Sequence, residues 1–251
     1  MVRIRIKFRK NGVMRFIGHL DIMRYFQKAM RRADIDIAYS EGFSPHQIMS
    51  FAAPLGVGVT SDGEYFDIEV NSSRSSEESI RALNQTMEEG MEVVSWVALR
   101  EGAKKAMTAV AAADYIVYFK KREDFSQQEI SGMIEAYYVD RNKIEIVKQS
   151  KKSERVVDLK PLIYEFRPYE DHFIPENKSD SSPAETIQKG FFLRLCTGST
   201  DNIKPELVLQ DFYAFFGKNY DPFNLQIHRL EVYERTGQGL VPLYMAGDEI
   251  C

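Results

Sequence analysis

The stretch from Arg15 to Val70 reads RFIGHLDIMRYFQKAMRRADIDIAYSEGFSPHQIMSFAAPLGVGVTSDGEYFDIEV, and it decides the fold of the first half of the chain. Residues 19–33 carry apolar side chains at helical spacing, which predicts a helix with one buried face. The turn-rich segment SEGFSPH follows at residues 40–46. Residues 47–51 and 64–70 then have the composition of strands.

The segments around this stretch extend the same pattern. Residues 2–8 alternate apolar and basic side chains, which predicts a strand with one buried face. The expected elements of residues 1–105 follow the order β-α-β-β-α-β, and a similar order returns in residues 113–236. We therefore predict an α+β fold of two tandem ferredoxin-like units. The second unit is expected to carry an exposed insertion at about 168–189, and residues 237–251 to form a loose tail.

Composition narrows the classes of protein that this chain can belong to. The net charge is −4 over 251 residues, yet residues 1–50 hold ten Arg and Lys against four Asp and Glu, a net of +6. Residues 61–101 hold ten acids against three arginines, a net of −7. This asymmetry favours one electropositive face within an acidic protein, although an ordinary solvated surface with internal pairing gives the same counts.

The cysteines and the apolar runs exclude several further classes. Cys196 and Cys251 are the only cysteines and form no CxxC pair, so the chain alone cannot build a cysteine zinc site or an iron–sulfur cluster. We expect a reducing, cytoplasmic location. The first residues lack the apolar core of a signal peptide, and no apolar run reaches 18 residues, so no membrane span is expected.

The four histidines give no metal-ligand spacing, and no cofactor-binding loop is visible, so we predict neither a metal nor a cofactor. No nucleophile–base pair is visible either, and we therefore predict no catalytic residue. His19 and His46 could still converge for general acid–base work or phosphate contact. The alternative is one histidine at a helix start and one in a turn.

The basic helix is the strongest candidate for a function. Cations on one helix face can neutralise phosphates, while nearby aromatic residues can stack on bases. A solvated cationic face on an ordinary helix explains the spacing equally well. The predicted RNA-contacting residues are Arg15, His19, Arg24, Lys28, Arg31, Arg32, Ser40, Phe43 and His46.

Three motifs carry a resemblance to a known family: RFxGHLD at 15–21, SEGFxPH at 40–46 and PLG at 54–56. With them the chain resembles an uncharacterised bacterial family of radical-SAM-associated proteins, in which this module stands alone or follows a radical SAM domain. The resemblance implies an accessory module rather than the radical enzyme. Many relatives carry Pro and a basic residue after the second histidine, whereas this chain has Gln47 and Ile48, which lowers the positive charge there.

The genes near such relatives imply a connection to RNA or the ribosome. We therefore expect a non-catalytic accessory protein that binds structured RNA, either rRNA or tRNA, or presents it to a separately encoded radical SAM protein. One alternative is an adaptor that binds a partner protein through residues 61–101 and binds no RNA. A second alternative is a metal-free RNA-processing enzyme that uses His19 and His46.

Overall fold

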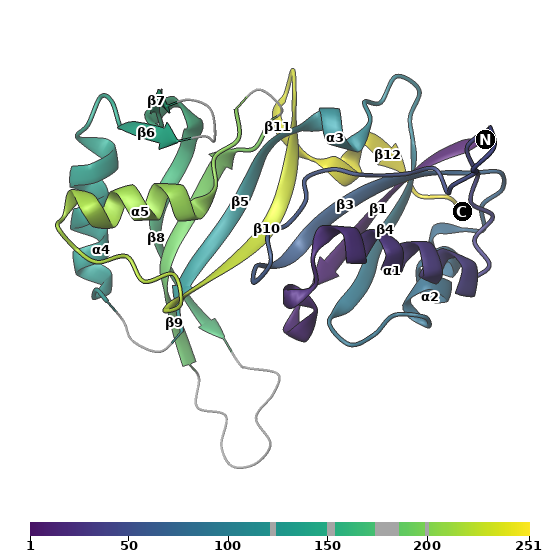
Figure 1. Cartoon of the computed structure of the whole chain (residues 1–251), viewed down its shortest axis with the longest axis horizontal. Helices are drawn as coiled ribbons and strands as arrows, with labels where there is room; N and C mark the ends of the chain where they lie inside the picture. Colours follow the sequence, from purple (N-terminus) through teal and green to yellow (C-terminus); the bar gives the residue numbers. More distant parts are fainter. Residues whose placement is uncertain (121–123, 150–153, 174–185, 199–200) are drawn as a thin grey trace, which may run out of the picture. The chain divides into compact units, whose positions relative to one another are not determined.

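The computed structural model describes residues 1–251 except 121–123, 150–153, 174–185 and 199–200. It confirms the predicted α+β class, with helices beside a mixed β-sheet (Figure 1). By internal contacts the chain divides into two units. Unit 1 comprises Met1–Ala113, Thr197–Thr200 and His228–Cys251, and unit 2 comprises Asp114–Cys196 and Asp201–Ile227.

Unit 1 holds the N-terminal elements and the end of the chain. Its elements are β1 (Val2–Lys10), η1 (Gly12–Phe16), α1 (His19–Arg32), β2 (Met49–Phe51), β3 (Thr60–Val70), α2 (Ser76–Asn84), β4 (Met91–Leu99), α3 (Ala106–Ala109), β11 (Gly239–Pro242), η4 (Leu243–Ala246) and β12 (Gly247–Asp248). Strands β5 (Val110–Phe119) and β10 (Leu225–Thr236) contribute residues to both units.

The strands of unit 1 run in the order β12-β4-β1-β3, and β2 also pairs with β3. All of these pairings are antiparallel. The residues of β10 from His228 onward add a short parallel pairing to β3.

Helices α1 and α2 cover one face of this sheet (Figure 1). The alternation of β1 sends Ile4, Ile6 and Phe8 to that face, where they are buried. Phe8 meets Phe26 of α1 with ring centroids 4.7 Å apart. The predicted inward stripe of α1 therefore packs as its spacing indicates, with Ile22, Phe26, Ala29 and Ala33 all buried.

Unit 2 holds the remaining elements. They are α4 (Gln127–Ile134), the π-helix η2 (Glu135–Val139), β6 (Glu145–Gln149), β7 (Glu154–Asp158), η3 (Lys160–Leu162), β8 (Ile163–Phe173), β9 (Thr186–Cys196) and α5 (Pro205–Phe215). Its strands follow the order β10-β5-β9-β8, and β6 and β7 form a separate hairpin. Phe166 of β8, Phe191 of β9 and Phe212 of α5 form its aromatic core, with centroids 5.4–6.0 Å apart.

Two of the expected boundaries differ from the structure. The predicted insertion at 168–189 is shorter, because β8 continues to Phe173 and β9 begins at Thr186; residues 174–185 lie outside the described residues. The predicted loose tail at 237–251 is wrong, because this segment folds against unit 1. There β12 pairs with β4, and Arg100 forms an ion pair with Asp248. These long-range contacts leave no local signal in the sequence.

Candidate functional site

Helix α1 presents most of the predicted cations to solvent. Arg24, Lys28, Arg31 and Arg32 are all exposed. Arg24 has one weak exposed ion pair, 3.3 Å from Asp21. Residues 24, 28 and 31 lie along one side of the helix by their spacing. Arg32 is turned another way, because it donates a 3.0 Å hydrogen bond to the carbonyl of Thr86.

The SEGFSPH segment forms a closed loop with an aromatic side chain at its tip. Ser40 Oγ lies 2.8 Å from His46 Nδ1 and accepts a 3.1 Å hydrogen bond from the His46 backbone N–H. The Ser40 N–H donates to the His46 carbonyl at 2.9 Å. Gly42 takes a φ of 106°, which favours glycine over residues with a Cβ. Phe43 beside it is fully exposed.

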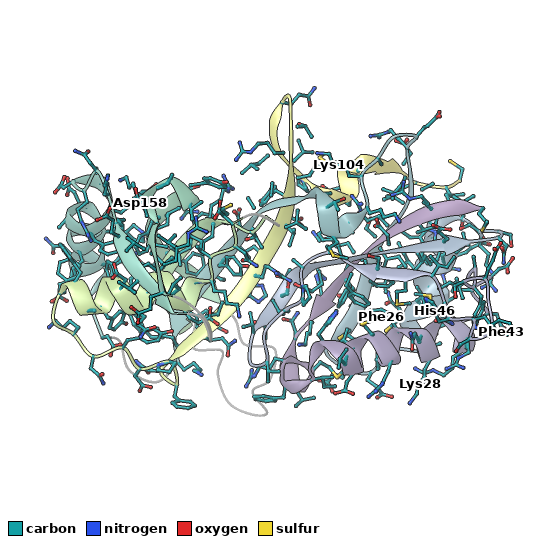
Figure 2. The ribbon with its side chains drawn as sticks, turned by 45° about the horizontal axis from the view of Figure 1, so that its top comes forward. Phe26, Lys28, Phe43, His46, Lys104 and Asp158 are labelled. Atoms are coloured by element: carbon teal, nitrogen blue, oxygen red, sulfur yellow. The ribbon has the colours of Figure 1, made fainter. Side chains whose placement is uncertain are left out.

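This loop is attached to the middle of α1. Gln47, only 6% exposed, donates from Nε2 to the Gln27 carbonyl at 3.3 Å. Gln27 lies three residues after Arg24 and four before Arg31, so all three share one side of the helix. The loop therefore stands beside the cations, and Figure 2 shows Lys28, His46 and Phe43 in the same region of unit 1. We call Arg24, Lys28, Arg31 and the loop Ser40–His46 the cationic surface.

The structure places Arg15 and His19 at a second location, the start of α1. The Arg15 guanidinium lies 4.8 Å from the Phe16 ring centroid, and the Arg15 carbonyl accepts a 2.8 Å hydrogen bond from the Gly58 N–H. Pro54 and Leu55 line one small cavity together with His19, so the family-like motifs at 15–21 and 54–56 come together here. His19 packs edge-on against Phe51 with centroids 5.3 Å apart.

His19 and His46 belong to different surroundings. His46 bonds within its own loop, whereas His19 lines a small cavity of about 10 Å³ with Lys10, Phe51 and Glu64. A cavity of this size holds about one water molecule. Within the described residues, the two imidazoles share neither a hydrogen bond nor a ring contact. The arrangement is that of one histidine at a helix start and one in a turn.

A group of buried charges that the sequence did not predict lies behind His19. Arg229 of β10 and Glu64 of β3 are 2% and 5% exposed and share hydrogen bonds of 2.5–2.8 Å. Lys10 is 2% exposed and donates to the Ile17 carbonyl at 2.9 Å. The sequence does hold one indication that Lys10 is buried. Lys10 continues the alternation of β1 on the face that carries Phe8. Nothing in the sequence pairs Arg229 with a partner 165 residues away.

This environment lowers the pKa of His19, mainly through burial and also through the charge of Lys10, while Glu64 acts in the opposite direction. We predict that replacing Lys10 by Met raises this pKa, because the opposing charge of Glu64 remains. NMR titration of the imidazole C–H signals measures the shift. Because the pKa of His19 is lower in the folded protein, the unfolded chain binds more protons at this residue. The free energy of unfolding therefore decreases as the pH falls through the unfolded-state pKa of about 6.5. An unchanged or lower His19 pKa in the folded Lys10→Met variant would contradict the conclusion that the charge of Lys10 lowers this pKa.

The described residues hold no group of three or more His, Cys, Asp or Glu side chains that could bind a metal ion. No helix among the described residues is both long and apolar enough to cross a membrane.

The comparisons with known proteins identify the family of this chain. Residues 3–205 match the model of a family described as an uncharacterized protein conserved in bacteria, DUF2344, and the chain belongs to this family. Curated proteins give no match. Among solved structures, the chain is similar to one in a Cbf5-Nop10-Gar1 complex, with a TM-score of 0.47 and 9% identity. The similarity covers 91% of this chain and 48% of that chain, so this chain spans about half of its length.

Proposed function

We propose that this protein is a non-catalytic accessory module that binds structured RNA through the cationic surface. The observation that carries the proposal is the fully exposed Phe43 on a loop fixed beside exposed Arg24, Lys28 and Arg31. Arginine and lysine neutralise phosphates, and an exposed aromatic ring stacks on an unpaired base.

We propose further that both units are ferredoxin-like. In unit 1 the order β4-β1-β3-β2, with antiparallel pairs and with α1 and α2 in the two crossovers, supports this assignment. In unit 2 the order β10-β5-β9-β8 supports it, with the β6–β7 hairpin inserted after α4. The fold alone assigns no function.

The proposed partner protein is a separately encoded radical SAM enzyme in the cytoplasm, to which the module presents its RNA. The support is the resemblance carried by the motifs at 15–21, 40–46 and 54–56. The two cysteines are free in the structure, which suits a reducing compartment.

The test is a charge reversal of the cationic surface with Arg24→Glu, Lys28→Glu and Arg31→Glu together. We expect RNA affinity to fall roughly 100-fold at low salt, and the wild-type log–log salt slope to be about −2 to −3 for three neutralised phosphates. The thermal unfolding midpoint should stay nearly unchanged, since these side chains are exposed. Fluorescence anisotropy with labelled tRNA and rRNA fragments measures the affinity.

A matched control separates local contact from net charge. The variant Lys104→Glu, Lys105→Glu, Lys143→Glu changes the net charge equally at other exposed positions, and Figure 2 shows Lys104 and Lys28 on opposite sides of unit 1. It should retain most of the affinity. Phe43→Ala should weaken binding about tenfold through lost stacking. Full RNA retention by a folded α1 triple variant would overturn the proposal and favour the adaptor function.

A further inference from the structure

An exposed apolar patch lies at the start of α1, formed by Val13, Phe16, Leu20 and Val57. These four side chains are 61–74% exposed. Val13 and Phe16 share one side of η1, because residues three apart eclipse each other in a 3₁₀-helix. Met14, which lies between them in the sequence, is buried in the core of unit 1. A single exposed apolar residue is ordinary at a protein surface, whereas a contiguous group of them indicates a binding surface.

Two connections bring the members of this apolar patch together. The Gly58 N–H donates a 2.8 Å hydrogen bond to the Arg15 carbonyl, which brings Val57 next to the end of η1 that carries Phe16. Leu20 follows in the first turn of α1, at the end of the helix that adjoins η1. The apolar patch is therefore one surface, built from three segments of unit 1.

The apolar patch continues into the cationic surface along one side of α1. Four residues at spacings of four, four and three lie on this side of the helix: Leu20, Arg24, Lys28 and Arg31. Residues 1–33 and the loop 40–46 contain only two acids, Asp21 and Glu41. Arg15 adds a further cation at the apolar patch, where its guanidinium lies 4.8 Å from the Phe16 ring centroid. Positive charge therefore extends from one end of α1 to the other.

Phe43 lies at the opposite end of this row of cations. In Figure 2, Phe26, Lys28 and Phe43 follow one another in the direction in which α1 runs. Leu20 and Arg31 lie about 16 Å apart along the helix axis, at a rise of about 1.5 Å per residue. The row of cations thus has an exposed ring at each end, Phe16 at the start of α1 and Phe43 beyond its middle.

This order of rings and cations favours single-stranded RNA over a duplex. A duplex keeps its bases stacked inside, so it would meet the cations and leave both rings uncovered. A single strand offers phosphates to the cations and unstacked bases to the rings. A length of about 16 Å accommodates about five nucleotides, at the rise of about 3.4 Å per nucleotide of a helical strand.

We propose that the RNA-binding surface includes the apolar patch and takes a single-stranded segment of about five nucleotides within a structured RNA. One base stacks on Phe16 and another on Phe43, while the phosphates between them meet Arg24, Lys28 and Arg31. This inference rests on the proposed function and specifies the class of RNA that the surface binds.

The test measures the affinity of the full chain, by fluorescence anisotropy, for RNA duplexes that carry a 3′ single-stranded overhang of increasing length. We expect the affinity to rise until the overhang reaches about five nucleotides and then to level off. A blunt duplex with the same number of phosphates should bind at least about tenfold more weakly, because it offers no unpaired base.

Three variants show whether Phe16 acts by stacking. Phe16→Ala should weaken binding of the overhang RNA about tenfold and leave binding of the blunt duplex unchanged. Phe16→Trp should keep or strengthen the wild-type affinity, because indole also stacks on a base, whereas a role in packing alone predicts no such rescue. Phe223→Ala removes a phenylalanine of unit 2 that is 83% exposed, and as the matched control it should change nothing. Thermal unfolding verifies that each variant is folded.

The outcomes separate this inference from the proposed function. If RNA binding depends on Arg24, Lys28 and Arg31 but neither on Phe16 nor on overhang length, the inference is overturned and the proposed function stands. If no RNA binds, both fail. If Phe16 is required for binding to vesicles of phosphatidylglycerol and phosphatidylcholine but not for binding to RNA, the inference is overturned and the apolar patch belongs to a membrane-binding surface.

Discussion

Replacement of Arg5 by Met is expected to destabilise unit 1 by about 3–5 kcal/mol, because it leaves a buried carboxylate without its cation. Arg5 is fully buried, and its Nε and Nη2 donate to the two carboxylate oxygens of Asp67 at 2.8 and 3.0 Å. Its remaining donors reach the carbonyls of Leu243 at 3.1 Å and Lys104 at 2.9 Å. Urea unfolding followed by the fluorescence of Trp96 measures the loss.

Two comparison variants isolate the cause of this loss. Adding Asp67→Asn to Arg5→Met removes the uncompensated charge and keeps an acceptor for the Ala106 N–H, which now donates to Asp67 at 2.7 Å. The double variant should recover a large part of the stability. Arg81→Met breaks an exposed pair and should cost less than about 1 kcal/mol. If Arg5→Met cost no more than Arg81→Met, the buried pair would not be a determinant of this fold.

The local periodicities of the sequence predicted the elements that carry the cationic surface. The predicted helix over 19–33 is α1 at His19–Arg32, and the alternating strand at 2–8 is β1 at Val2–Lys10. Burial follows directly from such spacing, because a helix or strand presents each residue to a face fixed by its geometry. Exposure of Arg24, Lys28 and Arg31 could be inferred for the same reason.

The long-range arrangement could not be inferred in this way. Arg229 and Glu64 form a buried pair, yet charged residues are expected at the surface unless a partner is known. The return of β10 and the C-terminal segment to unit 1 depends on contacts such as Arg100 with Asp248, 148 residues apart. The sequence could not predict the groove that lies on the unit 1 sheet for the same reason. Its wall comes from residues 244–249 and its floor from β1 and β4, which are far apart in the chain.

Gly190 of β9 is a position in unit 2 where a single added carbon should have a large effect. A Cβ there would lie 1.9 Å from the Val117 carbonyl oxygen and 2.8 Å from the Tyr118 Cα, both backbone atoms of β5. Backbone atoms in a sheet cannot move aside without breaking the β5–β9 pairing. We expect Gly190→Ala to destabilise unit 2 by at least about 3 kcal/mol.

Gly132 of α4 provides the matched control for this substitution in the same unit. A Cβ at Gly132 meets no atom within 4 Å, and alanine is favoured over glycine in a helix by about 0.8–1 kcal/mol. Gly132→Ala should therefore leave unit 2 unchanged or slightly more stable. Hydrogen exchange of the β5 and β9 amides reports on both variants. Equal protection in Gly190→Ala and wild type would show that β5 and β9 tolerate a wider spacing than their backbone contact at Gly190 indicates.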